Sequence, residues 1–245
     1  MENDKLDRLG EKHMNNEGYE MEIIECFGWE KYTVEFKDGL QIRNKRYSHI
    51  VNGSIKNPHH KSIHKVGYIG VGKYRKSSHH KIYYIWVNIL GRCYSITQQT
   101  KRPTYIGCIV DERWHNFQNF AKWYEENYIE GFHLDKDILV KGNKIYSPET
   151  CTFIPQEINC LLTRRQNHRG SLPIGVKKNQ NKFEVIISKV GKSVYIGVFD
   201  TPKEAFQVYK TAKETYIKKV ANKWKHLITS QTYEALINYK VQITD

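Results

Sequence analysis

Long uncharged stretches are missing from this sequence of 245 residues. No window approaches the roughly 18 consecutive apolar residues that a membrane-spanning helix needs. The first five residues, Met-Glu-Asn-Asp-Lys, also lack the order of basic and then apolar residues that is typical of a secretory signal. We therefore expect a protein without a membrane segment, located in the cytoplasm.

Paired cysteines are also missing. The five cysteines are odd in number and scattered, without a C-x-x-C pair, which argues against a secreted disulfide framework. Three of them could in principle meet at a structural zinc with a fourth ligand: Cys93, Cys108 and Cys151, with His115 or Cys160. Without paired spacing the sequence favours reduced, mostly buried thiols, and structural zinc is not expected.

Acidic residues are the minority among the charged ones. Lys and Arg number 39 against 26 Asp and Glu, which gives a formal net charge of +13. The excess is +2 over residues 1–75, +3 over 76–168 and +8 over 169–245. Such an excess favours a polyanionic partner such as DNA, and the C-terminal third is expected to make most of the salt-dependent phosphate contacts.

The N-terminal 75 residues predict a small antiparallel β module. Strand patterns cover residues 21–26, 32–36 and 40–42, and Asp38-Gly39 is a strong signal for a two-residue hairpin because Gly tolerates the positive φ of a type I′ turn. Since the charge of this region is nearly balanced, it fits contact with a protein partner better than contact with DNA.

The middle third predicts helices and then a β-β-α unit. Apolar residues recur at helical spacing around 81–94 and 112–127. An extended stretch at 133–139, a turn at 141–143, a second extended stretch at 151–154 and a helix that opens at Pro155 follow. The β-β-α unit is thus expected at about residues 132–165.

The residues of this unit resemble the phage-borne HNH (His-Me finger) endonuclease family. The similarity is carried by Leu134-Asp135-Lys136-Asp137-Ile138, by the run from Gly142 to Cys151 that includes Tyr146-Ser147-Pro148-Glu149, and by Gln156-Glu157-Ile158-Asn159. It extends over about residues 81–166. The resemblance implies a single divalent metal ion, Mg²⁺ or Mn²⁺, that assists hydrolysis of a DNA phosphodiester, and a bacterial host cell as the location.

The resemblance also implies the roles of individual residues. By position, Asp135 matches the metal ligand on the strand and Asn159 the ligand on the helix, with Asn143 in the turn as a further candidate. Lys136 stands where family members carry the histidine that activates water. Since an ordinary lysine is protonated at neutral pH, it is a poor base, but it could hold a phosphate or stabilise the transition state.

The residue pattern alone also allows a different general base. His133, Asp135 and Asp137 alternate and would share one face of a continuous strand, so His133 could activate water for a metal held by the two carboxylates. A polar surface strand without any catalytic role accounts for the same pattern.

The last third predicts three short strands, at 174–177, 183–188 and 193–199, and a helix at 202–224. Thr201 is suited to cap this helix, with Pro202 in its first turn and Glu204 three residues after the cap. This region resembles the Apetala-two or ethylene-response-factor DNA-binding domain in Tyr195-Ile196-Gly197-Val198-Phe199-Asp200-Thr201 and in Glu204-Ala205. The resemblance implies that the sheet lies in the major groove of duplex DNA.

The expected DNA contacts are mostly lysines. They are Lys177, Lys178, Asn179, Lys182, Ser188, Lys189, Lys192 and Tyr195, together with Arg164 and Arg165 in the basic linker. Lysines suit phosphate contacts, which fix register without reading bases, and no arginine remains on the predicted sheet to read guanine. We expect salt-sensitive binding with a modest base preference.

Together these patterns predict an α+β protein with an N-terminal β module (1–75), an HNH-like domain (76–168) and an Apetala-two-like domain (169–245). The favoured function is that of a DNA endonuclease similar to phage HNH and homing enzymes. Two alternatives stay open: a DNA-binding regulator that has lost cleavage, and an interaction protein that binds its partner through residues 1–75.

Overall fold

The computed structural model describes residues 8–28, 31–162, 172–189 and 191–243. It has the predicted mixed α+β character. The chain divides into two compact units, one made of residues 1–95 and 112–121, the other of residues 96–111 and 122–245. Each unit is described by itself.

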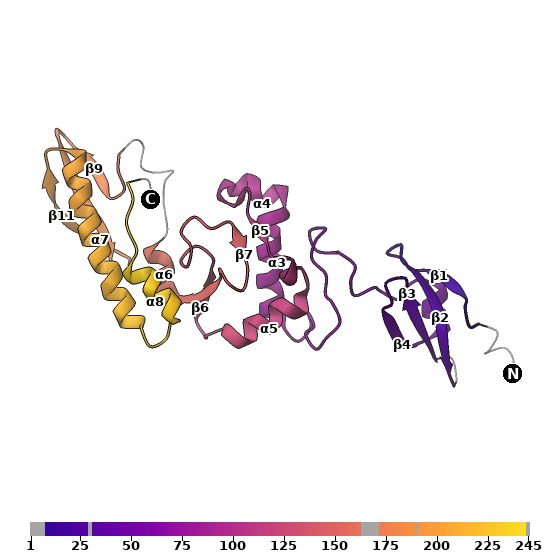
Figure 1. The fold of residues 1–245 in the computed structure, drawn as a ribbon. Coiled ribbons are helices and arrows are strands. Elements are labelled where there is room, and N and C mark those ends of the chain that lie inside the picture. The colour runs from indigo at the N-terminus through magenta and orange to yellow at the C-terminus, as the bar shows by residue number, and fades with distance from the viewer. Residues whose placement is uncertain (1–7, 29–30, 163–171, 190, 244–245) are drawn as a thin grey trace. The chain divides into compact units, whose positions relative to one another are not determined.

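The first unit begins with an antiparallel sheet, drawn in indigo in Figure 1. Its four strands are neighbours in chain order: β1 (Lys12–Met14), β2 (Glu20–Phe27), β3 (Lys31–Phe36) and β4 (Gln41–Lys45). The short helix α2 (Tyr47–Val51) follows. One face of the sheet is apolar and packs on Ile50 of α2 and on Ile55, and its buried residues are Met21, Ile23, Tyr32, Val34 and Phe36. The predicted antiparallel β module is therefore present.

The hairpin between β3 and β4 forms where the sequence predicts it, but with a different turn. Gly39 has a φ of 81°, whereas Asp38 does not adopt a positive φ. A type I′ turn would need positive φ at both residues. Instead, Asp38 Oδ1 accepts a hydrogen bond from Leu40 N at 3.2 Å, which is the local bond that favours Asp in turns.

The rest of the first unit is held by aromatic side chains. Helix α3 (His80–Tyr94) is one residue longer than predicted. The predicted helix 112–127 is instead a 3₁₀ turn (Glu112–His115) followed by α5 (Phe117–Asn127), whose residues from Lys122 on belong to the second unit. Trp86 donates a hydrogen bond from its indole nitrogen to the carbonyl of Trp114 at 2.6 Å, and its ring lies 5.2 Å from that of Phe117. This bond satisfies a buried indole N–H that would otherwise be costly.

The second unit contains the β-β-α element. Strand β6 (Phe132–Asp135) pairs antiparallel with β8 (Thr152–Pro155), and α6 (Gln156–Leu161) follows directly. Between the two strands, β7 (Ile145–Tyr146) pairs in parallel with β5 (Ile109–Val110). The chain also forms α4 (Ile96–Lys101) and a 3₁₀ turn (Pro103–Tyr105) before β5.

A three-stranded antiparallel sheet completes the second unit, in the order β11-β10-β9. The strands are β9 (Val176–Asn179), β10 (Lys182–Lys189) and β11 (Lys192–Phe199). Helix α7 (Pro202–Trp224) packs on this sheet, as Figure 1 shows in orange, and α8 (Ser230–Ile237) packs on α7. The predicted bounds of α7 are confirmed, and Thr201 Oγ1 accepts a hydrogen bond from Glu204 N at 3.2 Å as its cap.

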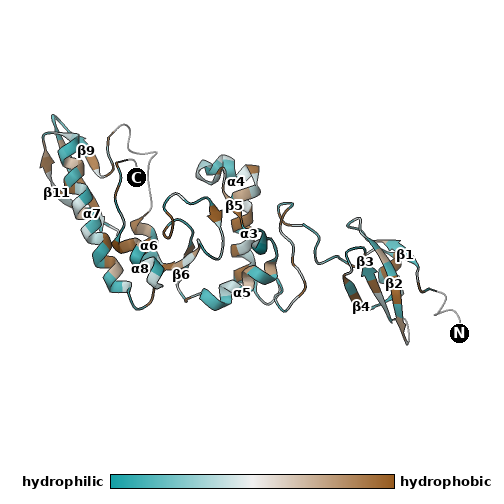
Figure 2. Ribbon diagram, in the orientation of Figure 1, coloured by the Kyte–Doolittle hydropathy of each residue, from teal (hydrophilic) through white to brown (hydrophobic). Residues whose placement is uncertain are grey.

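A glycine sets the approach of α7 to the sheet. Gly175, just before β9, has a φ of 77°, and a Cβ atom built there would lie 2.0 Å from the ring of Tyr209 on α7. Any residue with a Cβ atom would collide with the Tyr209 ring at this position and would be strained by the positive φ. Figure 2 shows hydrophobic and hydrophilic residues mixed along α7, as expected for a helix with one face on a sheet.

The β-β-α element and the C-terminal sheet share one hydrophobic core. Its fully buried members include Ile154 and Ile158 from the former and Val185 and Ile187 from the latter. The predicted domain boundary at 168 thus lies inside the second unit and does not separate two cores. Among the described residues, no helix has the length and apolar character needed to cross a bilayer.

Candidate functional site

The β-β-α element places the predicted metal ligands on neighbouring pieces of backbone. Asp135 is the last residue of β6, opposite Thr152 of β8. Asn159 lies half-buried on α6, and α6 packs against both β6 and β8. Because Ile154 and Ile158 are both fully buried, they fix the helix to the strand pair.

Asp135 has one carboxylate oxygen in use and one available. Its Oδ1 accepts hydrogen bonds from the backbone nitrogens of Asp137 and Ile138, both at 2.8 Å. Among the described residues, nothing donates to its Oδ2. Burial raises the pKa of Asp135, although the two backbone hydrogen bonds act in the opposite direction. A cation on Oδ2 would relieve the cost of this half-buried charge.

The same two bonds end the strand. The backbone turns at residues 136–140 instead of continuing as the predicted strand 133–139. The predicted common strand face of His133, Asp135 and Asp137 is therefore not formed, since Asp137 lies beyond the strand. His133 and Asp135 are two residues apart in β6, so they lie on the same face of the strand. The His133 side chain is exposed.

Lys136 has a structural role. The residue is only 7% exposed. Its Nζ donates to Asp137 Oδ1 at 2.6 Å and to the carbonyl of Asn143 at 2.7 Å, and it lies 5.7 Å from the centre of the Tyr146 ring. An ammonium engaged in this way is not a base, and breaking the pair would leave a buried charge without a partner.

Asn143 closes the same loop. Its Nδ2 donates to the carbonyls of Lys136 at 2.8 Å and Ile145 at 2.6 Å, and its Oδ1 accepts from Ile145 N at 3.0 Å. All three bonds are made to the loop between β6 and β8. They give Asn143 a positioning function and leave Asp135 and Asn159 as the oxygen donors we consider for a metal.

The donor set suits a hard cation. Mg²⁺ binds carboxylate, amide and water oxygens and usually keeps several waters, so one carboxylate and one amide are a sufficient protein contribution. Within the described part of the chain, no three His, Cys, Asp or Glu side chains form a metal-holding group. Burial raises the pKa of the nearby Cys151 thiol to about 12, which keeps it protonated.

The strand register sorts the predicted DNA contacts of the C-terminal sheet by face. Val185 and Ile187 are fully buried against α7, so the residues that alternate with them lie on the outer face. The register shift between Val185 and Ile186 comes from an extra residue in β11, Ile196, so β10 alternates without interruption and Tyr195 pairs with the outer residue Ile186. The outer face carries these predicted contacts: Lys177, Asn179, Lys182, Ser188 and Tyr195.

The remaining lysines lie elsewhere. Lys178 pairs with Phe183, and Lys189 pairs with Lys192, so all three belong to the helix side or its rim. The ammonium of Lys189 is 5.6 Å from the centre of the Tyr216 ring of α7. These lysines can reach phosphates only at the edge of the sheet. Arg164 and Arg165 lie outside the described residues.

The outer face combines an exposed aromatic ring with available cations. Tyr195 is 59% exposed and Val198 is 40% exposed. Lys182 forms an exposed ion pair with Asp200 at 3.1 Å, which is weak in water. Lys177 has no ion-pair partner within the described ranges. We call this surface, made of Lys177, Asn179, Lys182, Ser188 and Tyr195, the C-terminal sheet face.

Two features were not predictable from motifs. Glu157 on α6 accepts hydrogen bonds from Lys223 Nζ at 2.5 Å and Trp224 Nε1 at 2.8 Å, which join α6 to the end of α7. Thr152 of β8 bonds to Thr232 of α8 at 3.1 Å. Both are contacts between residues more than 60 positions apart, for which no local pattern exists.

The chain matches no protein-family model, no curated protein and no solved structure. The resemblance to HNH and Apetala-two proteins stays a prediction from the motif residues.

Proposed function

We propose that this protein is a divalent-metal-dependent DNA endonuclease that holds duplex DNA on the C-terminal sheet face. The observation that carries the proposal is the position of Asp135, at the end of β6, with Oδ1 fixed by two backbone nitrogens and Oδ2 available. Asn159 on the adjoining helix α6 supplies the second oxygen. The order of strand, strand and helix is the one that the HNH resemblance implies.

A bound Mg²⁺ or Mn²⁺ ion would stabilise negative charge on the scissile phosphate. His133 is the group of this chain suited to take a proton from water, because it is exposed on the side of β6 that carries Asp135. Lys136 supports the site by holding Asp137 and the carbonyl of Asn143 in place. DNA of a bacterial cytoplasm would be the substrate, as the resemblance implies.

The C-terminal sheet face supports duplex binding. The major groove of B-DNA admits β-strands, and lysines at the rim of a sheet reach the flanking phosphates. Because the face carries no arginine, we expect binding that depends on salt more than on sequence.

A second candidate is a DNA-binding protein without cleavage. The observation that favours it is the burial of Lys136, since the position of the family's base is used for an internal ion pair.

Nicking of supercoiled plasmid in Mg²⁺ or Mn²⁺ tests the endonuclease. We expect Asp135→Ala and Asn159→Ala to lower the rate at least about 100-fold, because each removes a ligand, and His133→Ala to lower it to a similar extent. Glu126→Ala, an exposed carboxylate of α5, is the matched control and should cut normally. If both ligand variants still cut, the site is elsewhere. If neither the wild type nor any variant cuts in either metal, but all of them bind DNA, the result supports a DNA-binding protein without cleavage.

Gel-shift titrations over a range of salt test the DNA face. Lys177→Glu with Lys182→Glu should weaken duplex binding and flatten its salt dependence by about one unit of slope per lost phosphate contact. Lys203→Glu, an exposed lysine of α7, changes the net charge equally per residue and should have a smaller effect. If Lys203→Glu lowers the affinity for duplex DNA as much as each substitution on the C-terminal sheet face does, only the overall charge matters.

A further inference from the structure

The chain between α2 and the first turn of α3 is basic throughout. Residues 56–81 contain seven Lys and Arg residues and no Asp or Glu. Residues 1–55, by contrast, contain 11 Asp and Glu residues against eight Lys and Arg. The near balance of charge over residues 1–75 therefore arises from two parts of opposite sign. We call residues 56–81 the basic segment, and its cations are Lys56, Lys61, Lys65, Lys73, Arg75, Lys76 and Lys81.

The cations of the basic segment are exposed and mostly without counter-charges. All seven residues are exposed. Lys81 lies in the first turn of α3, which holds no acidic residue, and a cation at this end of a helix opposes the helix dipole. The segment thus carries a self-repulsion that a polyanion would relieve. Within the described ranges, five of the seven have no ion-pair partner: Lys56, Lys61, Lys65, Arg75 and Lys76.

The basic segment is folded onto the start of α5. The Tyr68 nitrogen donates to the carbonyl of His115 at 2.9 Å, and the Tyr68 carbonyl accepts from Phe117 N at 2.9 Å. The Gln118 side chain accepts from the nitrogen of Tyr74 at 3.0 Å and donates to its carbonyl at 3.0 Å. Since the segment is already ordered, binding a ligand would not incur the entropic cost of ordering a loop.

A tight turn in the segment presents a lysine at a conformational cost. His64 and Lys65 have φ values of 49° and 64°. They lie between Ile63 and Gly67, whose backbones bond in both directions, at 3.0 Å and 2.8 Å. Two successive positive φ values favour Asn and Gly. A turn that keeps other residues in this conformation is typical of a segment that contacts a ligand.

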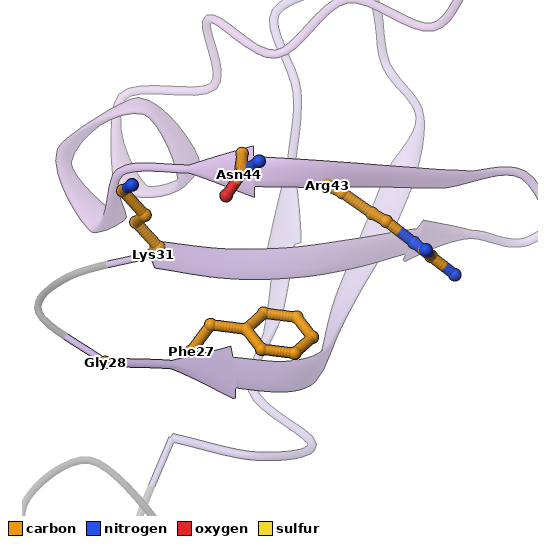
Figure 3. Close-up of a pocket in the computed structure, with 5 residues that line it drawn as sticks. All are labelled: Phe27, Gly28, Lys31, Arg43 and Asn44. Atoms are coloured by element: carbon orange, nitrogen blue, oxygen red, sulfur yellow. The ribbon is translucent and has the colours of Figure 1, made fainter.

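The cations of the N-terminal sheet are arranged differently. Lys31 and Arg43 line a solvent-open cavity of about 620 Å³. Figure 3 shows their side chains extending apart, so they do not converge on one phosphate. By strand alternation, Glu22, Glu25 and Glu35 lie on the same face as Lys31. Because the charge of this face is mixed, it is suited to a matched control and not to a polyanion.

We propose that the basic segment binds the phosphate backbone of duplex DNA, which gives the first unit a DNA contact of its own. Its lysines neutralise phosphates, and the exposed hydroxyls of Ser62 and Ser77 donate hydrogen bonds to phosphate oxygens. This surface is additional to the C-terminal sheet face and does not depend on cleavage.

The composition of the segment favours duplex DNA over other polyanions. Six of its seven cations are lysines, and protein interfaces favour arginine and aromatic residues instead. Single strands need a row of exposed aromatic rings on which bases stack. The two tyrosines of the segment, Tyr68 and Tyr74, are half-buried and buried, and Tyr84 of α3, stacked on His80, is a single exposed ring. A duplex offers the densest phosphate charge, about one per 1.7 Å.

The test uses the full chain carrying Lys177→Glu and Lys182→Glu, which lowers the contribution of the C-terminal sheet face, in EDTA so that DNA is not cut. In fluorescence anisotropy, a duplex of about 20 base pairs should still bind. Adding Lys61→Glu and Lys65→Glu should weaken this binding about 10-fold in about 100 mM salt and lower its salt slope by about two units. A single strand of the same length should bind more weakly than the duplex.

Lys31→Glu with Arg43→Glu is the matched control, because it reverses two exposed cations of the same unit outside the basic segment. It should weaken duplex binding less than about threefold. The proposal is overturned if this control weakens binding as much as Lys61→Glu with Lys65→Glu does. It is also overturned if the single strand binds as tightly as the duplex, or if poly-glutamate of the same charge competes as well as the duplex.

Lys65→Gly separates binding from folding. It should weaken duplex binding about threefold, because one phosphate contact is lost. The urea midpoint of unfolding should stay the same or rise, because Gly adopts a positive φ without strain. Weaker binding together with a lower midpoint would trace the loss to the fold and speak against the proposal. Since no assay here uses cleavage, failure of the endonuclease proposal would not affect these outcomes.

Discussion

Two lysines of the second unit are shielded from water, but only one of them has polar partners. Lys136 is buried with two oxygen partners. Lys213 is half-buried on α7, one turn from the buried Tyr209 and one turn from the buried Ile217, and has no ion-pair or hydrogen-bond partner in the described ranges. Burial lowers the pKa of Lys213 to about 8. At neutral pH the folded protein must therefore hold an uncompensated charge.

This predicts that the destabilisation caused by Lys213 diminishes as the pH rises above neutrality. The unfolded chain keeps the Lys213 proton up to its ordinary pKa of about 10.4, whereas the folded chain loses it near pH 8. Between these values the unfolded state binds more protons, so the free energy of unfolding increases with pH. We expect Lys213→Met to be more stable than wild type by about 1 kcal/mol at pH 7, a value reduced for the side chain's partial exposure.

Urea denaturation at pH 7, 8 and 9.5 measures this effect. The gain from Lys213→Met should shrink as the pH rises, since the wild-type lysine becomes neutral. Lys210→Met, one turn away and paired with Glu214 at 3.9 Å, serves as the control and should not show this trend. A constant difference between Lys213→Met and wild type at all three pH values would contradict the prediction.

At the same scale, the sequence indicated which residues could act but not how they are held. Asp135 could be chosen by its place in the motif. That the ammonium of Lys136 turns inward depends on Asn143, whose carbonyl is brought beside it by the loop. A contact that exists only after the loop closes leaves no periodic signal in the sequence.

At the scale of elements, long periodic segments were predictable and short ones were not. Helix α7 was predicted with its bounds, because a 23-residue amphipathic pattern and a capping threonine agree. Strands β1, β5 and β7 have only two or three residues, too few for an alternating pattern, and were not predicted. The predicted strand at 133–139 was too long because the side chain of Asp135 captures the next backbone nitrogens.

Sheet pairing also decided what the C-terminal lysines can do. From the sequence, Lys177 and Lys178 were equivalent candidates for DNA contact. Pairing with Glu184 places Lys177 on the outer face, and pairing with Phe183 places Lys178 on the other side. Only the register, which depends on β10, separates the two.

At the scale of the whole molecule, the shared core of the second unit changes where the chain can be divided. A cut at residue 168 would separate Ile154 and Ile158 from Val185 and Ile187, all fully buried in one cluster. It would also break the bond between Thr152 and Thr232. The domain boundary expected from the two resemblances is thus not a boundary of packing.

We expect a fragment of residues 169–245 to be less stable than the same residues within a fragment of residues 96–245. The isolated fragment would expose the apolar surface that Ile154 and Ile158 cover. Full burial of one isoleucine side chain stabilises a fold by about 1.5–3 kcal/mol. Amide hydrogen exchange of β10 and α7 in the two fragments measures the difference. Equal protection in both would show that the C-terminal sheet and helix form an independent core.

The shared core has a consequence for where such an enzyme would cut. Because the strand pair that carries Asp135 and the C-terminal sheet face share one core, the proposed endonuclease would cut at a constant number of base pairs from the DNA held on that face. Lengthening the chain between residues 162 and 172 would not shift the break, because the packing and not the connecting peptide sets the spacing.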